Sequence, residues 1–290
     1  MNFQMKKTKK KINEEEVESL EQENFSLTKL LDDDLIKSRE EEDSKVPSKF
    51  WKASELGLCM RKAIFRRLGV KGAPLTAREL KTMKAGELFH KFMQELTKKT
   101  GISVEQEMFL EDEELEYRGK IDDIVKLGNT LYVFEYKSEH SKSFDWRKKS
   151  EEKISKHHII QGMSYLHFLI KKYKGKTNYG DIKKVRWIYI SKDDMRMDEL
   201  EIEYTKEWGE FIENILKSLS DSLKKKKLPK PIDFIRDKEF GWQCAGLERY
   251  GLYKGKYKPR CQYFKYCREI VGDYDTSILT PQINDNEQND

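Results

Sequence analysis

The sequence has 290 residues, of which 38% are charged, and a net charge of +5. This length fits one medium domain with appendages or two small domains. No run of 18 apolar residues occurs, which argues against a membrane span, and the lysine-rich start has no apolar segment after it, which argues against a secretory signal. We therefore expect a cytoplasmic protein that does not contact a membrane.

The charge is unevenly distributed along the chain. Residues 1–45 have a balance of −4 and residues 271–290 a balance of −5, so residues 46–270 have a balance of +14. A basic body suits a polyanionic partner such as nucleic acid, although a lysine-rich composition alone also produces such a surface. We expect residues 1–45 to be an acidic leader, helical or disordered, that offers residues 14–43 to a possible protein partner.

The apolar patterns predict alternating helices and strands in the body. Ser54 is a candidate helix cap, and residues 80–96 have the spacing of an amphipathic helix. A strand at 102–110 precedes a hairpin at 119–137. A helix at 152–174, a strand at 185–191 and a helix at 205–226 follow. This order predicts an α/β sandwich with a mixed central sheet flanked by helices. The core is expected over 46–228, with a cysteine-containing lobe at 229–270 and an acidic tail at 271–290.

The hairpin carries the clearest chemical signal. If Gly128 and Asn129 form a two-residue turn, Asp122 lies directly opposite Glu135, and Lys137 points to the same face of the sheet. Two carboxylates placed together repel each other unless a cation lies between them, and a lysine beside them suits an anionic oxygen or a water nucleophile. The pattern indicates a metal-dependent phosphodiesterase site. A solvated acidic pair on an exposed sheet face is the alternative.

The helices on either side of the hairpin carry further polar residues. Gly86 and His90 are four residues apart, so they share one helix face, and a glycine there would let another element or a substrate backbone come close. Gln161 and Tyr165 are likewise one turn apart in an apolar segment. A packed core histidine and a helix-surface hydrogen bond are the alternative interpretations of these pairs.

In this order and on these elements, GxxxH, GxxD, ExK and QxxxY resemble the RecB-like branch of the PD-(D/E)XK nuclease superfamily, over about residues 54–270. The resemblance implies a restriction-endonuclease-like core and a metal-dependent deoxyribonuclease. It implies a Mg²⁺ or Mn²⁺ site, which oxygen ligands with one imidazole suit. The implied metal ligands are His90, Asp122, Glu135 and the backbone carbonyl of Tyr136. Lys137 would place or activate the attacking water, and Gln161 and Tyr165 would contact substrate or order the site.

Four cysteines form the second signal, namely Cys59, Cys244, Cys261 and Cys267. Four thiols in a reducing compartment suit a tetrahedral zinc or an iron–sulfur cluster. One cysteine before the core and three after it resemble the iron–sulfur RecB-like nucleases, including the CRISPR-associated single-domain exonucleases and AddB-type recombination nucleases. This resemblance implies a 4Fe-4S cluster that joins the two ends of the domain. Because 16 residues separate Cys244 from Cys261, where that family has a short spacer, zinc remains the alternative.

The expected substrate is DNA, either single-stranded or at its ends, and an exonuclease activity is expected from the resemblance. Arginines near Cys59, the lysine run 224–227 and tyrosines among lysines near the insertion suit a strand whose bases stack and whose phosphates are attracted. The candidate DNA contacts are Arg61, Arg66, Arg67, Tyr250, Tyr253 and Tyr257. The alternative function is a catalytically silent DNA-binding or scaffold subunit that keeps the fold and the cluster. Repair, recombination, phage replication and CRISPR adaptation are the pathways that the resemblance implies.

Overall fold

The computed structural model describes residues 26–233, 236, 241–247 and 257–270. The remaining parts of the leader, the acidic tail, Tyr250 and Tyr253 lie outside the described residues, as does the side chain of Tyr257. Contacts divide the chain into two units, one formed by residues 1–45 with 76–81 and the other by 46–75 with 82–290. In the first unit, helix α2 (Leu27–Asp43) begins after Ser26, whose hydroxyl accepts a hydrogen bond from the amide of Lys29.

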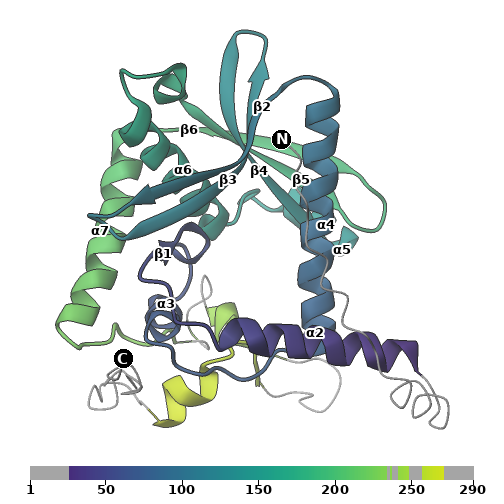
Figure 1. The fold of residues 1–290 in the computed structure, drawn as a ribbon, viewed down its shortest axis with the longest axis vertical. Helices are drawn as coiled ribbons and strands as arrows, with labels where there is room; N and C mark the ends of the chain where they lie inside the picture. The colour runs from purple at the N-terminus through teal and green to yellow at the C-terminus, as the bar shows by residue number, and fades with distance from the viewer. Residues whose placement is uncertain (1–25, 234–235, 237–240, 248–256, 271–290) are drawn as a thin grey trace, which may run out of the picture. The chain divides into compact units, whose positions relative to one another are not determined.

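The second unit is built on a mixed six-stranded sheet in which β1, β3, β4, β5 and β6 are neighbours in this order and β2 pairs with β3 (Figure 1). Neighbours β1/β3 and β4/β5 are parallel, and the other pairs are antiparallel. The strands are β1 (Trp51–Lys52), β2 (Ser103–Asp112), β3 (Tyr117–Leu127), β4 (Thr130–Glu139), β5 (Lys184–Ser191) and β6 (Met197–Glu203). This mixed sheet with flanking helices confirms the predicted α/β class.

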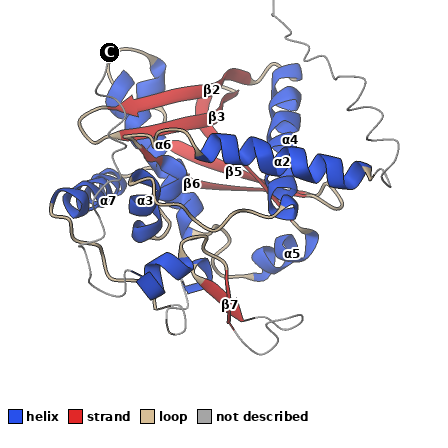
Figure 2. Cartoon of the chain, turned by 60° about the horizontal axis from the view of Figure 1, so that its bottom comes forward, coloured by secondary structure: helices blue, strands red, loops and turns tan. Residues whose placement is uncertain are grey.

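Helices lie on both faces of the sheet (Figure 2). The larger core cluster is formed by α6, α7 and apolar residues of β3, β4 and β5, and a smaller cluster joins Phe89 and Met93 of α4 to β3, β4 and β5. Gly162 lets α6 approach closely, because a Cβ there would lie 2.6 Å from the indole of Trp187. The helices are α3 (Met60–Arg67), α4 (Ala77–Lys99), α5 (Ser141–Lys149), α6 (Lys156–Tyr173) and α7 (Lys206–Lys224).

The small lobe after α7 contains a 3-10 turn and a two-stranded ribbon. The turn is η3 (Gly241–Gln243), and β7 (Ala245–Leu247) pairs antiparallel with β8 (Tyr257–Pro259). A π-helical turn η4 (Tyr266–Ile270) ends the described chain. Within the described residues no helix is both long and apolar enough to cross a membrane.

Three local predictions differ from the structure. Ser54 lies inside a single 3-10 turn, η1 (Ala53–Glu55), and the helix that follows begins after Cys59 instead. Helix α5 was not predicted because its sequence is short and strongly charged. Strand β6 was not predicted because acidic residues occupy alternate positions on its exposed side.

Candidate functional site

The β3–β4 hairpin has the predicted register. Leu127 pairs with Thr130 across the turn, and the paired residues continue to Asp123 and Phe134. The next position in this register places Asp122 opposite Glu135. There the backbone pairing ends, and the side chain of Asp122 reaches across instead. Its Oδ2 accepts a hydrogen bond of 2.9 Å from the amide of Tyr136. The two carboxylates therefore occupy neighbouring strands at one point of the sheet.

Glu135 is the most constrained member of this pair. Its side chain is 1% exposed, and one carboxylate oxygen, Oε1, contacts the ammonium group of Lys137. The other, Oε2, is buried and has no hydrogen-bond partner among the described residues. Burial and, after it, the charge of Asp122 raise the pKa of Glu135 to about 7, against the opposing effect of Lys137. An unpaired oxygen on a buried carboxylate is costly to the fold, so this position is suited to a bound cation.

The lysine connects the strand to helix α6. Lys137 Nζ donates to Gln161 Oε1 at 3.1 Å, and Gln161 Nε2 donates to the hydroxyl of Tyr165 at 2.8 Å. Both Gln161 and Tyr165 are buried. Because the amide is held from both sides, it fixes the direction of the lysine ammonium group. The residues of the predicted ExK and QxxxY patterns therefore form one hydrogen-bonded chain.

His90 approaches the same carboxylates from helix α4. Its Nδ1 lies 3.5 Å from Asp122 Oδ2. Burial lowers the pKa of His90, but the hydrogen bond and charge of Asp122, together with Glu135, raise it above its usual value. The prediction that Gly86 admits another protein element is not supported, because a Cβ there would meet only Ser138 Oγ, at 3.9 Å.

Gln94 is a site residue that the sequence analysis missed. It follows His90 by one helical turn, and its Nε2 donates to the backbone carbonyl of Asp122 at 2.9 Å and to Glu107 Oε1 at 2.7 Å. Glu107 has a φ of 57° in strand β2, a left-handed conformation that is unusual for a non-glycine residue. The sequence could have identified Gln94, because it lies four residues after His90 and residues four apart share a helix face.

Gly119 makes room for the ring of Tyr165, the last member of the hydrogen-bonded series Lys137, Gln161 and Tyr165. We expect Gly119→Ala to lower the free energy of unfolding by about 1–3 kcal/mol and to reduce any activity of the site. The added methyl group would overlap the hydroxyl of Tyr117 and lie 2.9 Å from the ring of Tyr165. Displacing that ring removes the partner of Gln161 and, through it, the support of Lys137.

Urea unfolding of the variant measures this effect, with Gly86→Ala as the control. At Gly86 a Cβ is accommodated, and alanine in place of glycine inside a helix is expected to stabilise by about 0.5–1 kcal/mol. Equal destabilisation by both substitutions would contradict the steric argument for Gly119.

The carboxylates and the imidazole do not surround a common point. Among the described residues, no group of three or more His, Cys, Asp or Glu side chains is arranged to hold a metal ion. Asp122 contacts His90 and Glu135 contacts Lys137, so each carboxylate meets a cationic or polar neighbour. The amide of Tyr136 donates a hydrogen bond to Asp122. That its carbonyl coordinates a metal ion stays a prediction. The donor types fit Mg²⁺ or Mn²⁺, and the unpaired Glu135 oxygen is the observation that supports such an ion.

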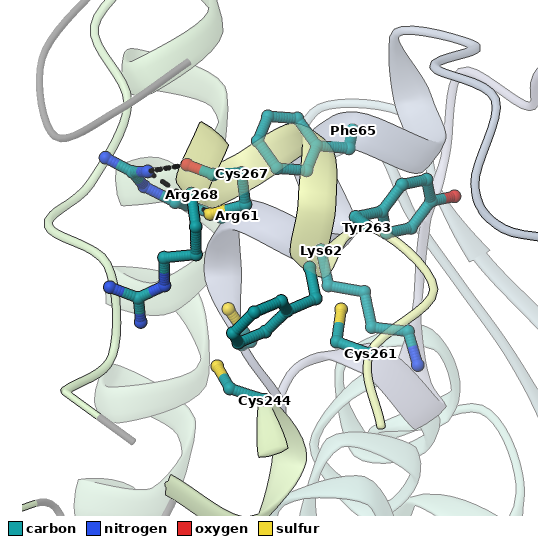
Figure 3. Close-up of a pocket in the computed structure, with 10 residues that line it drawn as sticks. Arg61, Lys62, Phe65, Cys244, Cys261, Tyr263, Cys267 and Arg268 are labelled. Carbon is teal, nitrogen blue, oxygen red and sulfur yellow. Dashed lines mark hydrogen bonds between the residues drawn. The ribbon is translucent and has the colours of Figure 1, made fainter. Parts of the chain in front are cut away.

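The four cysteines line one pocket although the core separates Cys59 from the others in the sequence, but among the described residues no three of their thiols are arranged as a metal-binding group. They line one pocket of about 260 Å³, including space open to solvent, whose other lining residues are Arg61, Lys62, Phe65, Tyr263, Phe264 and Arg268 (Figure 3). Hydrogen bonding to Cys244 lowers the pKa of the Cys59 thiol, against burial, and backbone amides at the start of α3 lower it further. Cys244 therefore lies beside Cys59, although 16 residues separate it from Cys261 in the sequence.

The arginines near Cys59 have internal partners. Arg61 is 1% exposed and donates to the carbonyl of Pro229 at 2.7 Å and to Cys267 Sγ at 3.3 Å, so the prediction that it contacts DNA is wrong. Arg66 pairs with Glu55 at 2.5 Å, and Arg67 pairs with Glu116 at 2.7 Å while it lies over the ring of Trp51. Arg66 and Arg67 therefore join segments of the fold, and a DNA contact of either residue stays a prediction.

The chain was also compared with known proteins. No protein-family model matches the sequence, and no curated protein matches it significantly. Similar solved structures include one titled crystal structure of SSO0001, with 18% identity and a TM-score of 0.43, which covers 76% of this chain and 92% of its own. An alkaline exonuclease, LHK-Exo from Laribacter hongkongensis, has 16% identity and a TM-score of 0.44, with 64% and 93% covered. Its complex with dAMP has 17% identity and a TM-score of 0.45, with 64% and 93% covered.

Proposed function

We propose that this chain is a metal-dependent DNA nuclease that hydrolyses phosphodiester bonds. The observation that carries the proposal is the buried carboxylate of Glu135, which has one unpaired oxygen and lies beside Asp122. Raised pKa values of this kind cluster at functional sites, and here the raised pKa accompanies two carboxylates on neighbouring strands. His90 on α4 contacts Asp122, while Lys137 on β4 contacts Glu135 and is held by Gln161 on α6.

The residues of the site have distinct proposed roles. Asp122, Glu135, His90 and the carbonyl of Tyr136 would hold Mg²⁺ or Mn²⁺, which when bound polarises a phosphoryl oxygen and lowers the pKa of water. Lys137 presents its ammonium group beside Glu135, where it suits an anionic oxygen of the substrate. Gln161 holds that ammonium group in place, and Tyr165 holds Gln161. Gln94 fixes the backbone of Asp122 from the other side.

The proposed substrate is DNA with a single-stranded region or a free end, degraded as by an exonuclease. The basic balance of residues 46–270 supports a polyanionic substrate. A silent scaffold subunit is the less favoured function. Burial disfavours the charged form of Glu135, and a protein without catalysis gains nothing from keeping such a glutamate in its interior. DNA in preference to RNA follows from the resemblance of the motifs.

Hydrolysis of end-labelled single- and double-stranded DNA with Mg²⁺, with Mn²⁺ and with EDTA tests the proposal. We expect metal-dependent cleavage by the wild type and its loss in Asp122→Ala. Asp145→Ala is the matched control, since Asp145, on α5, forms an exposed ion pair with Arg196 and lies outside the site. Absence of cleavage by the wild type under all conditions, or equal activity of Asp122→Ala and Asp145→Ala, would overturn the proposal.

We also propose that the four cysteines bind a 4Fe-4S cluster, with a zinc ion as the alternative. Four thiols lining one pocket match the number of ligands that either group requires. The buried Arg61 guanidinium donates to Cys267 Sγ, and a positive neighbour favours thiolate ligands. A cluster there would join the start of α3, which lies between β1 and α4 in the chain, to the lobe that follows α7.

Cys261→Ser is expected to abolish the visible absorbance and most of the bound iron of anaerobically purified protein. Loss of one thiolate leaves an incomplete ligand set, so both the metal content and the melting temperature should fall. Measuring the iron, sulfide and zinc content of the wild type distinguishes a 4Fe-4S cluster from a zinc ion. One zinc per chain without iron would establish the alternative, and a wild type with neither metal would contradict both.

A further inference from the structure

The lobe that carries three of the cysteines also presents an aromatic side chain against helix α6, which carries Gln161 of the candidate active site. Trp242 lies in η3, between the core and β7, and is 47% exposed. Its ring centroid lies 5.7 Å from that of His157, with an angle of 52° between the planes. An exposed indole offers a large flat face on which a nucleic acid base can stack.

His157 connects this tryptophan to the site through helix α6. It lies in the first turn of α6, four residues before Gln161, which corresponds to about 6 Å along the helix axis. Gln161 in turn holds the ammonium group of Lys137. The charge of Lys137 also acts on His157: burial, followed by that charge, lowers the pKa of His157 to about 4. The imidazole is therefore neutral near pH 7, which suits a stacking surface.

The positions of both rings are fixed by the protein backbone. Gly57 packs directly on His157, so closely that a Cβ at Gly57 would overlap the Cα of His157. On the other side, Gln243 Oε1 accepts a hydrogen bond of 2.8 Å from the amide of Cys59, and the amide of Cys244 donates to the carbonyl of Gly241 at 3.0 Å. Trp242 thus lies between two residues whose contacts belong to the cysteine pocket.

We propose that Trp242 and His157 form a stacking wall for an unpaired base of the nucleic acid strand whose phosphate lies at Lys137. The inference rests on the proposed nuclease function and specifies its substrate as a strand whose bases are free to leave a duplex. A base in an intact duplex is already stacked on both sides, whereas an unpaired base offers its face to an aromatic ring. The wall would favour single strands and frayed ends.

The wall also gives the cysteine lobe a part in substrate binding. Gln243 directly follows Trp242 and accepts a hydrogen bond from the amide of Cys59, and the next residue, Cys244, lines the pocket, so a group that orders the four cysteines also orders the indole. The lobe would then contribute to substrate selection by holding an aromatic ring at the edge of the site, in addition to closing the fold.

Binding to two strands of equal charge tests the proposal. The probes are a fluorescent oligothymidylate of 12 nucleotides and an abasic strand of the same length, measured in EDTA so that neither is cut. Trp242→Ala is expected to weaken binding of the oligothymidylate by roughly five- to hundred-fold and to leave binding of the abasic strand unchanged. Trp242→Phe should restore most of the lost affinity, because a phenyl ring still stacks.

Two controls separate stacking from misfolding. Trp146→Ala removes another exposed indole, 72% exposed on α5, and should leave both affinities unchanged. The metal content of Trp242→Ala should equal that of the wild type, which shows that the lobe is intact.

The outcomes distinguish this inference from the proposed function. A base-selective loss supports the wall. Equal losses on both strands, or no loss, would overturn the wall while leaving the nuclease function in place if the wild type still cuts DNA with Mg²⁺ or Mn²⁺. A wild type that binds neither strand would overturn both.

Discussion

Lys137→Met is expected to lower the rate of DNA hydrolysis at saturating substrate by about 10²- to 10³-fold, with a much smaller change in KM. The ammonium group lies between Glu135 and Gln161, so its position is set by two buried partners. Methionine keeps the length and most of the volume of the side chain but removes the positive charge. A charge that acts mainly on the transition state changes kcat and kcat/KM together.

Single-turnover and steady-state cleavage of single-stranded DNA in Mg²⁺ measure this effect. Lys184→Met is the matched control, because Lys184 lies on the neighbouring strand β5 and forms an exposed ion pair with Glu201. Its removal should change the rate less than two-fold, in keeping with the small contribution of surface ion pairs. A Lys137→Met enzyme with the rate of the control would show that the lysine takes no part in the reaction.

The hairpin shows how much of this site the sequence could predict. A two-residue turn at Gly128 and Asn129 fixes the register, and the register alone brings Asp122 and Glu135 to neighbouring positions. What it did not predict is that backbone pairing ends at Asp123 and Phe134. The pairing ends there because the amide of Tyr136 donates its hydrogen bond to the carboxylate of Asp122 instead of to a backbone carbonyl of the neighbouring strand.

The arginines of α3 show what the sequence could not predict. A basic run gives the sign of the charge but not the direction in which each side chain points. Arg61 lies on the buried side of a short helix, where its guanidinium meets Pro229 and Cys267, residues about 170 and 200 positions away. Such partners follow from the tertiary fold, so no local pattern identifies them. The gathering of Cys59 with the later cysteines was expected only from the family resemblance, for the same reason.

Glu135→Gln is expected to stabilise the protein near pH 8 while abolishing metal-dependent cleavage. In the folded chain burial and Asp122 raise the pKa of Glu135 to about 7, whereas its usual value is 4.5. Between these values the folded state holds a proton that the unfolded state releases, so the free energy of unfolding contributed by this group falls as the pH rises from about 4.5 to 7. Above pH 7 the ionised carboxylate lowers stability by on the order of 3 kcal/mol.

Glutamine resembles the protonated acid in shape and is neutral at every pH. The variant and the wild type should therefore have similar melting temperatures at pH 5 and diverge toward pH 8, where the variant melts roughly 5–10 °C higher. Thermal melts in EDTA at pH 5, 6, 7 and 8 measure the difference. Glu199→Gln is the control, since Glu199 pairs with Arg186 on the surface and its removal should give no such divergence.

Metal binding explains why the site would keep the unfavourable charge of Glu135. A divalent ion that binds the folded state only adds stability that grows with its concentration, so Mg²⁺ or Mn²⁺ should raise the melting temperature of the wild type at pH 8 and leave that of Glu135→Gln unchanged. The ion would satisfy the Oε2 atom that has no partner among the described residues and relieve its repulsion with Asp122. A variant that gains no stability at pH 8, or that responds to the metal as the wild type does, would show that Glu135 belongs to an ordinary buried ion pair with Lys137.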